Sequence, residues 1–373
     1  MPERLSLREA TTADEPGSHS AVPRRTRTRR RWLICCAVLS LSTLASLVAA
    51  EVVVRGYVFY RGWTPNCYAV GTTLLVPEPL NGYTLAENHR FQSGVRRIST
   101  NPFGLRGPAI TKAKPHGTRR IAVIGGSSVF GYLVSDGEEA CRVLEDRLRA
   151  NGYTVEVING GVPGYNLIQS GHRYDSHISP LKPDHVILYL GWNDLVYLLN
   201  ETPDVNIVGL GSCTSAMERM AAQSTLYGLV AHKLLNRTAE FNPSPHLGSQ
   251  PTEAGTRLFL ETLQSSVLRI QRSGADVMIC SQVMLAHPGI SEAAKPYLAG
   301  HGFAADQAIV LGLWLHDTLQ QFATTNDIPF IDAYNEIPPT TEMLGDVIHL
   351  TVQGEANLAA VWEREIIKLW PKQ

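Results

Sequence analysis

The fold is decided by the stretch Ile121-Ala122-Val123-Ile124-Gly125-Gly126-Ser127-Ser128-Val129-Phe130-Gly131. Its first four residues are apolar and rich in β-branched side chains, which predicts a buried strand of a parallel sheet. Two glycines then allow the chain to turn sharply at the end of that strand, where a Cβ would clash. Parallel α/β sheets place their chemistry at this end of the strands. We therefore expect Ser127 to present its hydroxyl there, at the start of a helix.

The glycines of this stretch also permit other interpretations. Gly126 and Gly131 have the spacing of a phosphate-binding loop, but Tyr132 and Leu133 replace the Lys and Ser/Thr that such a loop requires. The dinucleotide-binding spacing G-x-G-x-x-G is absent. A nucleophile turn and a plain structural turn both remain open on this stretch alone, so residues elsewhere must decide.

The composition is that of an ordinary globular protein, with 44% hydrophobic and 18% charged residues among 373. The net charge of −1 gives no reason to expect a nucleic-acid partner. Residues 1–31 are polar and hold eight Arg against four acidic residues, a net charge of +4. We predict that they form a disordered, basic cytoplasmic tail.

An uncharged apolar run of 19 residues follows, from Trp32 to Ala50. As a helix it would be about 28 Å long, close to the ~30 Å hydrocarbon core of a bilayer. The preceding arginines predict that the N-terminus is cytoplasmic and the rest of the chain extracytoplasmic. Apolar residues resume after Glu51, which favours an uncleaved transmembrane signal-anchor over residues 32–54. The alternative is a signal peptide cleaved near Ala50, which would release a secreted protein.

Residues 55–118 are punctuated by Gly and Pro, and we interpret them as a stalk and an irregular lead-in. Arg106, in a turn-rich part of it, either ties the lead-in to the domain or is exposed. Residues 119–373 alternate strands with helices, which predicts an α/β fold with a parallel sheet covered by helices on both faces. Strands are predicted at 121–124, 154–158, 185–190, 275–283 and 328–331. Helices are predicted around 140–148 and at 167–178, 252–273, 304–325 and 351–369, with a partly helical insertion at 195–251.

Three further sites follow predicted strands: Gly164, Asn193 and the Asp346–His349 segment. Asp346 and His349 are three residues apart, so in a helical turn they share a face and the carboxylate can orient the imidazole. A serine hydroxyl is a weak nucleophile until such an imidazole removes its proton. The N–H groups of Ser127 and Gly164 and the amide of Asn193 could then stabilise an oxyanion.

Each of these residues also has a structural interpretation. Asp346 could cap the last helix, and His349 could be one of twelve ordinary histidines. Asn193 could belong to a turn, and Gly164 to a loop. Their joint occurrence in this order, each after a predicted strand, favours the catalytic interpretation.

These residues resemble the four blocks of the SGNH/GDSL hydrolases, here residues 125–131, 159–166, 191–194 and 346–349. The resemblance covers about residues 119–370 and implies a flavodoxin-like three-layer α/β/α sandwich. It also implies roles for five residues. They are a nucleophile, Ser127; a base, His349, oriented by Asp346; and an oxyanion hole formed by Ser127, Gly164 and Asn193. The family often has Asp before the serine, where this chain has Gly126.

The resemblance implies a serine esterase or deacylase, with no cofactor and no metal. From the predicted location, the substrate would be an O-acyl ester, such as acetyl, on a small molecule, an extracytoplasmic glycan or a lipid. An acyltransferase using the same residues, or a non-catalytic glycan-binding module, are the alternatives. Cys67 and Cys213 lie in loop-like stretches and could pair, but the sequence does not fix this pairing.

Overall fold

The computed structural model describes residues 24–60, 74–78, 80–93, 96–199, 224–233, 250–299 and 304–370. Its contacts divide the chain into Met1–Val53 and Val54–Gln373. Most of the predicted insertion, the first 23 residues and both Cys67 and Cys213 lie outside the described residues.

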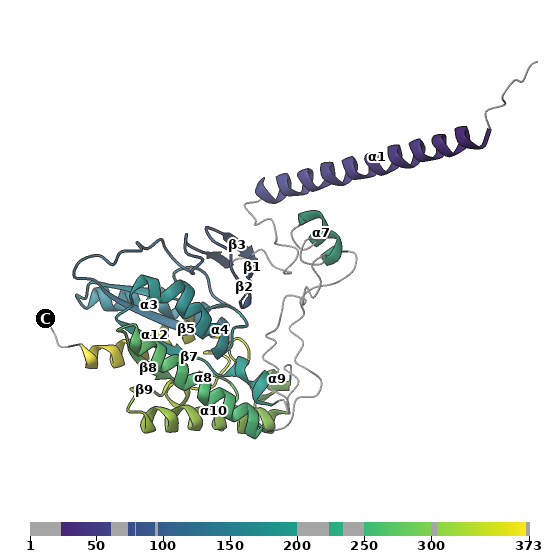
Figure 1. The fold of residues 1–373 in the computed structure, drawn as a ribbon. Coiled ribbons are helices and arrows are strands. Elements are labelled where there is room, and N and C mark those ends of the chain that lie inside the picture. Colours follow the sequence, from purple (N-terminus) through teal and green to yellow (C-terminus); the bar gives the residue numbers. More distant parts are fainter. Residues whose placement is uncertain are drawn as a thin grey trace, which may run out of the picture. The chain divides into compact units, whose positions relative to one another are not determined.

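The sheet predicted from the sequence is present as a five-stranded, all-parallel sheet with the order β6-β5-β7-β8-β9. The strands run side by side through the domain (Figure 1). They are β5 (Arg119–Gly125), β6 (Val155–Asn159), β7 (His185–Tyr189), β8 (Asp276–Cys280) and β9 (Phe330–Ile331). The predicted α/β class is therefore confirmed, although β8 ends before residue 283, where the sequence predicted its end.

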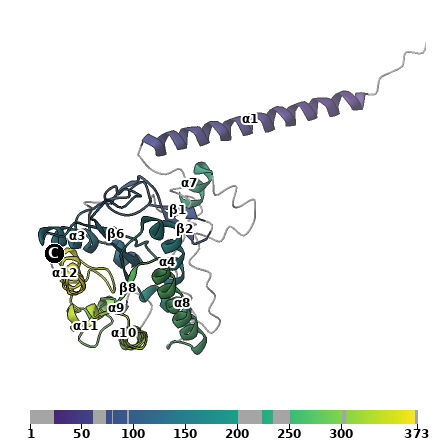
Figure 2. The ribbon, with the colours of Figure 1, turned by 60° about the vertical axis from the view of Figure 1, so that its left-hand side comes forward.

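Helices cover both faces of this sheet. The helices of the domain are α2 (Ser127–Phe130), α3 (Ala140–Ala150), α4 (Leu167–Arg173), α5 (Leu195–Leu198), α7 (Thr225–Lys233), α8 (Glu253–Arg272), α9 (Lys295–Ala299), α10 (Ala305–Thr325), α11 (Ala333–Glu336) and α12 (Val352–Leu369). Leu188 of β7 faces α4 and α8, whereas the ring of the next residue, Tyr189, packs on Trp362 of α12. Successive strand residues point to opposite faces, so these two contacts define a three-layer sandwich (Figure 2).

The predicted helix over 167–178 changes its geometry part-way. Helix α4 ends at Arg173, and the chain continues as a π-helix over Tyr174–Ile178. At the start of α4, Asn166 and Gln169 form a reciprocal capping box, which satisfies backbone N–H groups of the first turn.

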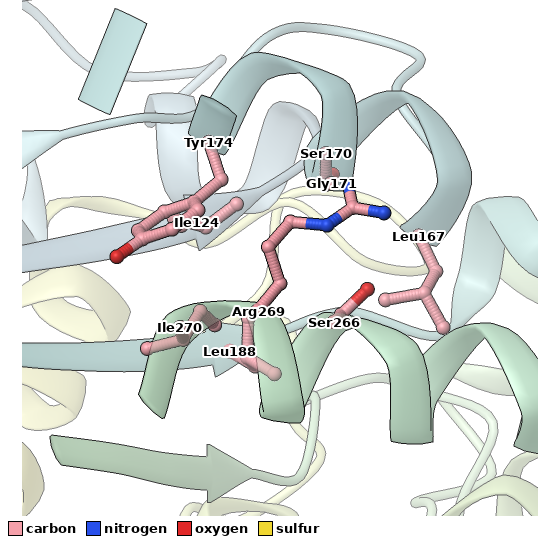
Figure 3. A pocket seen from close by; sticks show the side chains of 9 residues that line it. All are labelled: Ile124, Leu167, Ser170, Gly171, Tyr174, Leu188, Ser266, Arg269 and Ile270. Atoms are coloured by element: carbon pink, nitrogen blue, oxygen red, sulfur yellow. The ribbon is translucent and has the colours of Figure 1, made fainter. Parts of the chain in front are cut away.

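A small cavity lies between α4, α8 and the sheet (Figure 3). It has room for about one water molecule. The hydroxyls of Ser170 and Ser266 and the side chain of Arg269 lie along it. None of the predicted site residues lines this cavity, so we assign it to packing between the two helices.

The expectation of an irregular lead-in is wrong for four short segments between residues 75 and 99, which are strands paired antiparallel as two β-hairpins. Their strands are β1 (Leu75–Glu78), β2 (Gly82–Leu85), β3 (Arg90–Ser93) and β4 (Arg96–Ser99). Tyr83 and Ile98 pack in one cluster with Phe130 and Tyr165 of the sheet domain. Each strand has four residues, which is the lower limit of length at which an alternating pattern can be recognised. The hairpins are therefore packed against the domain and do not form a separate stalk.

Helix α1 spans Arg24–Tyr60. It begins before residue 32, so Arg24 to Arg31, expected to be disordered, are helical. Its segment Arg29–Tyr60 has a mean hydropathy of 2.3 over its most apolar part, and most of its large apolar side chains are exposed. By length and composition this segment could cross a membrane, as an anchor or as a signal sequence.

A buried carboxyl group links α12 to α3. Glu355 accepts a hydrogen bond of 2.9 Å from the backbone N–H of Ala140, at the first residue of α3. Burial raises the pKa of Glu355 to about 8; the Ala140 bond and Arg106 oppose this shift, and Glu139 adds to it. Glu355 is therefore largely protonated in the folded protein near neutral pH.

We expect Glu355→Gln to reduce the loss of stability at rising pH. The folded-state pKa is raised above the unfolded value, so the folded state holds a proton that the unfolded state releases. The free energy of unfolding should then fall between about pH 4.5 and pH 8, by at most ~1.4 kcal/mol per pH unit. Gln keeps an acceptor for Ala140 but does not titrate. Denaturant unfolding of both proteins across this range measures the effect, and parallel stability curves would contradict it.

Candidate active site

Ser127 is the first residue of α2 and follows β5 directly. The side-chain amide of Asn193 crowds the turn before it. A Cβ added to Gly126 would lie 2.5 Å from Asn193 Nδ2 and 3.0 Å from the carbonyl oxygen of Tyr165. In this structure, a side chain at position 126 would have to displace the amide of Asn193.

The structure brings Ser127, His349 and Asp346 together at one place. His349 Nε2 lies 2.7 Å from Ser127 Oγ, and His349 Nδ1 lies 2.7 Å from Asp346 Oδ2. The other carboxylate oxygen of Asp346 accepts from the backbone N–H groups of Ile348, at 3.0 Å, and His349, at 2.8 Å. The carboxylate thus fixes both the backbone and the ring of the histidine. This leaves Nε2 aimed at the serine hydroxyl.

The hydrogen bonds around Asp346 also favour its charged form. Burial raises the pKa of this carboxyl group. The hydrogen bond and charge of His349, with the two backbone N–H groups, outweigh burial and bring the pKa below its usual value. An ionised Asp346 can stabilise an imidazolium on His349 when the ring accepts a proton.

Asn193 and Gly164 lie in the two loops that border the serine turn. Asn193 follows β7 in a short 3₁₀ turn (Trp192–Asp194), and its amide donates to the carbonyl of Tyr165 at 2.9 Å. Gly164 precedes Tyr165 and has a φ of +82°, which favours glycine. Their proposed roles as oxyanion donors stay predictions.

Asp194 holds these two loops together. It is fully buried, and its Oδ1 accepts from the backbone N–H of Leu167 at 2.9 Å and from the hydroxyl of Tyr197 at 2.5 Å. Burial raises its pKa to about 6, while the bonds from Tyr197 and Leu167 oppose the shift. The residue next to Asn193 therefore anchors its loop to the start of α4.

Arg106 braces the other end of the serine helix. Its buried guanidinium donates to the carbonyls of Phe130 and Gly131, both at 2.5 Å, and of Val134 at 2.8 Å. The expectation that Arg106 ties the lead-in to the domain is confirmed. These bonds fix the chain where it leaves α2.

A hydrogen-bond chain that the sequence did not reveal joins the three site loops. Ser128 Oγ donates to the carbonyl of Ile348 at 3.0 Å and accepts from Gln282 Nε2 at 2.9 Å. Gln282 Oε1 in turn accepts from the backbone N–H of Trp192 at 3.0 Å. The residues beside Ser127, His349 and Asn193 are thus connected. Gln282 follows β8 just as the other site residues follow their strands, but the predicted strand extended past it.

We expect Gln282→Leu to lower kcat about tenfold with little change in KM. The buried N–H of Trp192 would lose its acceptor, which costs ~1–3 kcal/mol and loosens the loops. Gln282→Glu is the matched control, because it keeps the acceptor for Trp192 while removing the donor to Ser128. We expect it to lose less activity than Gln282→Leu. Steady-state kinetics of both variants measures the split. A loss of thermal stability with an unchanged kcat would show that the chain only supports the fold.

Among the described residues, no group of three or more His, Cys, Asp or Glu side chains is arranged to hold a metal ion. The groups that do come together are a hydroxyl, an imidazole and a carboxylate, in that order. This set of side chains can activate a serine oxygen as a nucleophile.

Solved structures with a similar fold include a lipase/acylhydrolase from Enterococcus faecalis, with 20% sequence identity over 68% of this chain and 99% of that chain and a TM-score of 0.44. A GDSL-like lipase from Bacteroides thetaiotaomicron has 16% identity over 70% and 93%, with a TM-score of 0.41. An acetyl xylan esterase has 14% identity over 66% and 99%, with a TM-score of 0.41. No curated protein matches the chain.

The sequence model of the GDSL-like Lipase/Acylhydrolase family matches residues 123–356, which is more than half of the chain. This segment contains all of the predicted site residues. The chain therefore belongs to the GDSL-like lipase/acylhydrolase family and is an ester-hydrolysing enzyme of that family.

Proposed function

We propose that this enzyme hydrolyses an O-acyl ester through a covalent acyl-enzyme on Ser127. The observation that carries the proposal is the chain from Ser127 Oγ to His349 Nε2 and from His349 Nδ1 to Asp346 Oδ2, with both distances at 2.7 Å. Such an arrangement lets the imidazole take the serine proton as the oxygen attacks.

Two half-reactions follow. Ser127 Oγ forms a bond to the ester carbonyl carbon while its proton passes to His349 Nε2, and the imidazolium then gives this proton to the departing alcohol oxygen. Water next attacks the acyl-serine, loses its proton to the same nitrogen, and releases the acid as the proton returns to Ser127. In both steps the carbonyl oxygen gains negative charge. The N–H groups of Ser127 and Gly164 and the amide of Asn193 are the proposed donors to it.

The proposed substrate is an O-acyl group, such as acetyl, on an extracytoplasmic glycan or lipid. Helix α1 supports this location, because its segment Arg29–Tyr60 is long and apolar enough to anchor the enzyme in a membrane. The arginines at its N-terminal end support a cytoplasmic N-terminus and an extracytoplasmic catalytic domain.

Labelling of the full-length chain with a fluorophosphonate, combined with hydrolysis of a short-chain aryl ester, tests this function. We expect one modified residue, identified as Ser127 by peptide mass spectrometry, and loss of hydrolysis in proportion to labelling. Modification elsewhere, or hydrolysis that persists in the labelled enzyme, would contradict the proposed nucleophile. If an added sugar acceptor captures most of the acyl group in place of water, the enzyme is a transferase.

A further inference from the structure

An arginine from outside the family's matched segment lies beside the site. It is Arg96 of the β3–β4 hairpin, whereas the match begins at residue 123. We propose that Arg96 and Tyr132 form a subsite that binds a carboxylate on the substrate, close to the ester that Ser127 attacks. This inference rests on the proposed function and names a chemical class for its substrate.

Tyr132 forms the floor of this subsite. It follows α2 in sequence, and its ring centroid lies 4.9 Å from that of His349, with 34° between the planes. The residue is 44% exposed, so part of it is open to solvent. A substrate held by Ser127 and His349 would therefore extend past Tyr132.

Arg96 is held against Tyr132 by two contacts. Its Nη1 donates to the carbonyl of Tyr132 at 2.8 Å, and its Cζ lies 5.9 Å from the centroid of the Tyr132 ring. The guanidinium of Arg96 and the imidazole of His349 therefore both lie near the ring of Tyr132. These two contacts restrict the conformations of the flexible Arg96 side chain.

The hairpin register explains why Arg96 points here and Arg97 does not. Ile98 is buried in the cluster between the hairpin and the domain, and Arg96 is two residues before it on the same strand. Residues two apart share a face of a strand, so Arg96 lies on the domain side. Arg97 lies on the opposite face and is exposed.

The guanidinium of Arg96 has donor capacity left for a ligand. A guanidinium carries five N–H donors, and within the described residues those of Arg96 make the single hydrogen bond to Tyr132. The nearby carboxylate of Asp136 already accepts from the backbone N–H and the hydroxyl of Ser99, and lies 3.7 Å from Arg106. The planar fork of a guanidinium matches a carboxylate, which it can bind through two parallel hydrogen bonds.

The test compares the release of acetate from 4-acetoxybenzoate, whose para substituent is a carboxylate, and from its neutral methyl ester. Relative to the rates at which the two acetyl esters hydrolyse without enzyme, we expect the full-length enzyme to favour the carboxylate in kcat/KM by roughly twofold to fivefold at low salt, as for an exposed ion pair. Arg96→Gln should bring the ratio of the two kcat/KM values close to that of the free esters' own reactivities, and Arg96→Lys should keep part of the preference. Added salt should weaken the preference in the wild-type enzyme.

Arg97→Gln is the matched control, since it removes the same charge from the opposite face of the hairpin. We expect it to keep the preference. If Arg97→Gln and Arg96→Gln change the ratio equally, the effect is that of a diffuse charge and the subsite is refuted. The subsite is also refuted if Arg96→Gln leaves the ratio at its wild-type value.

A binding measurement separates this inference from the proposed function. In a Ser127→Ala background, saturation-transfer NMR should detect 4-acetoxybenzoate, with a weaker signal when Arg96→Gln is added. If binding depends on Arg96 but the enzyme with Ser127 intact hydrolyses neither ester, the proposed function is refuted and the subsite stands. Binding that is independent of Arg96 would refute the subsite, whatever the hydrolysis rate.

Discussion

Ser127→Ala is expected to lower the turnover of a short-chain aryl ester by at least about 10⁴-fold. Without Oγ no acyl-enzyme can form, and any residual rate comes from water activated by His349 near the oxyanion donors. His349 Nε2 loses its partner at 2.7 Å, but its bond to Asp346 is unaffected, so the site should otherwise keep its geometry. Initial rates of the purified wild-type and variant enzymes measure the effect.

The adjacent serine provides the control for this substitution. Ser128→Ala also removes one buried hydroxyl from α2, together with the bonds to Ile348 and from Gln282. It should cost no more than the Gln282 substitutions and should still allow fluorophosphonate labelling. Equal rates for wild type and Ser127→Ala would exclude Ser127 as the nucleophile, whatever its distance from His349.

The central sheet could be predicted because its signal is local. Ile121 to Ile124 are almost completely inaccessible, and a strand buried on both faces must consist of consecutive apolar residues. The same holds for the serine turn, where a Cβ on Gly125 would come within 2.1 Å of the carbonyl of Tyr189. Asp346 and His349 were equally accessible to sequence analysis, since they are three positions apart and one turn brings them together.

The hairpins and the hydrogen-bond chain could not be predicted, because long-range contacts determine them. Strands β1 to β4 gain their stability from packing on Phe130 and Tyr165, which follow far along the chain. Gln282 has no local pattern that marks it. Its hydrogen bonds form only when the loops after β5, β7 and β8 converge at the carboxyl ends of these strands.

The close contact between Gly126 and Asn193 is of this long-range kind as well. Its local sequence suggests only a flexible turn, whereas the structure shows the amide of Asn193 in the space that a side chain would fill. Asn193 is thus close enough to the serine turn to act on a carbonyl bound there. Its present acceptor, the carbonyl of Tyr165, fixes the orientation of its amide without using both of its N–H groups.

Asn193→Ala is therefore expected to lower kcat by roughly 10²–10³-fold, the usual effect of losing one oxyanion donor. KM should change little, because the donor acts mainly on charge that develops in the transition state. Steady-state kinetics with an aryl ester whose hydrolysis is limited by acylation measures both parameters.

Two further variants distinguish loss of the donor from loss of packing. Asn193→Asp keeps the shape of the side chain but presents a carboxylate to the oxyanion, so it should be at least as slow as Asn193→Ala. Gly126→Ala keeps the amide but displaces it, because its Cβ would lie 2.5 Å from Asn193 Nδ2, and it should reproduce part of the loss in kcat. If Asn193→Asp retains wild-type kcat, the amide does not stabilise the oxyanion, and the donors must be the backbone N–H groups of Ser127 and Gly164 alone.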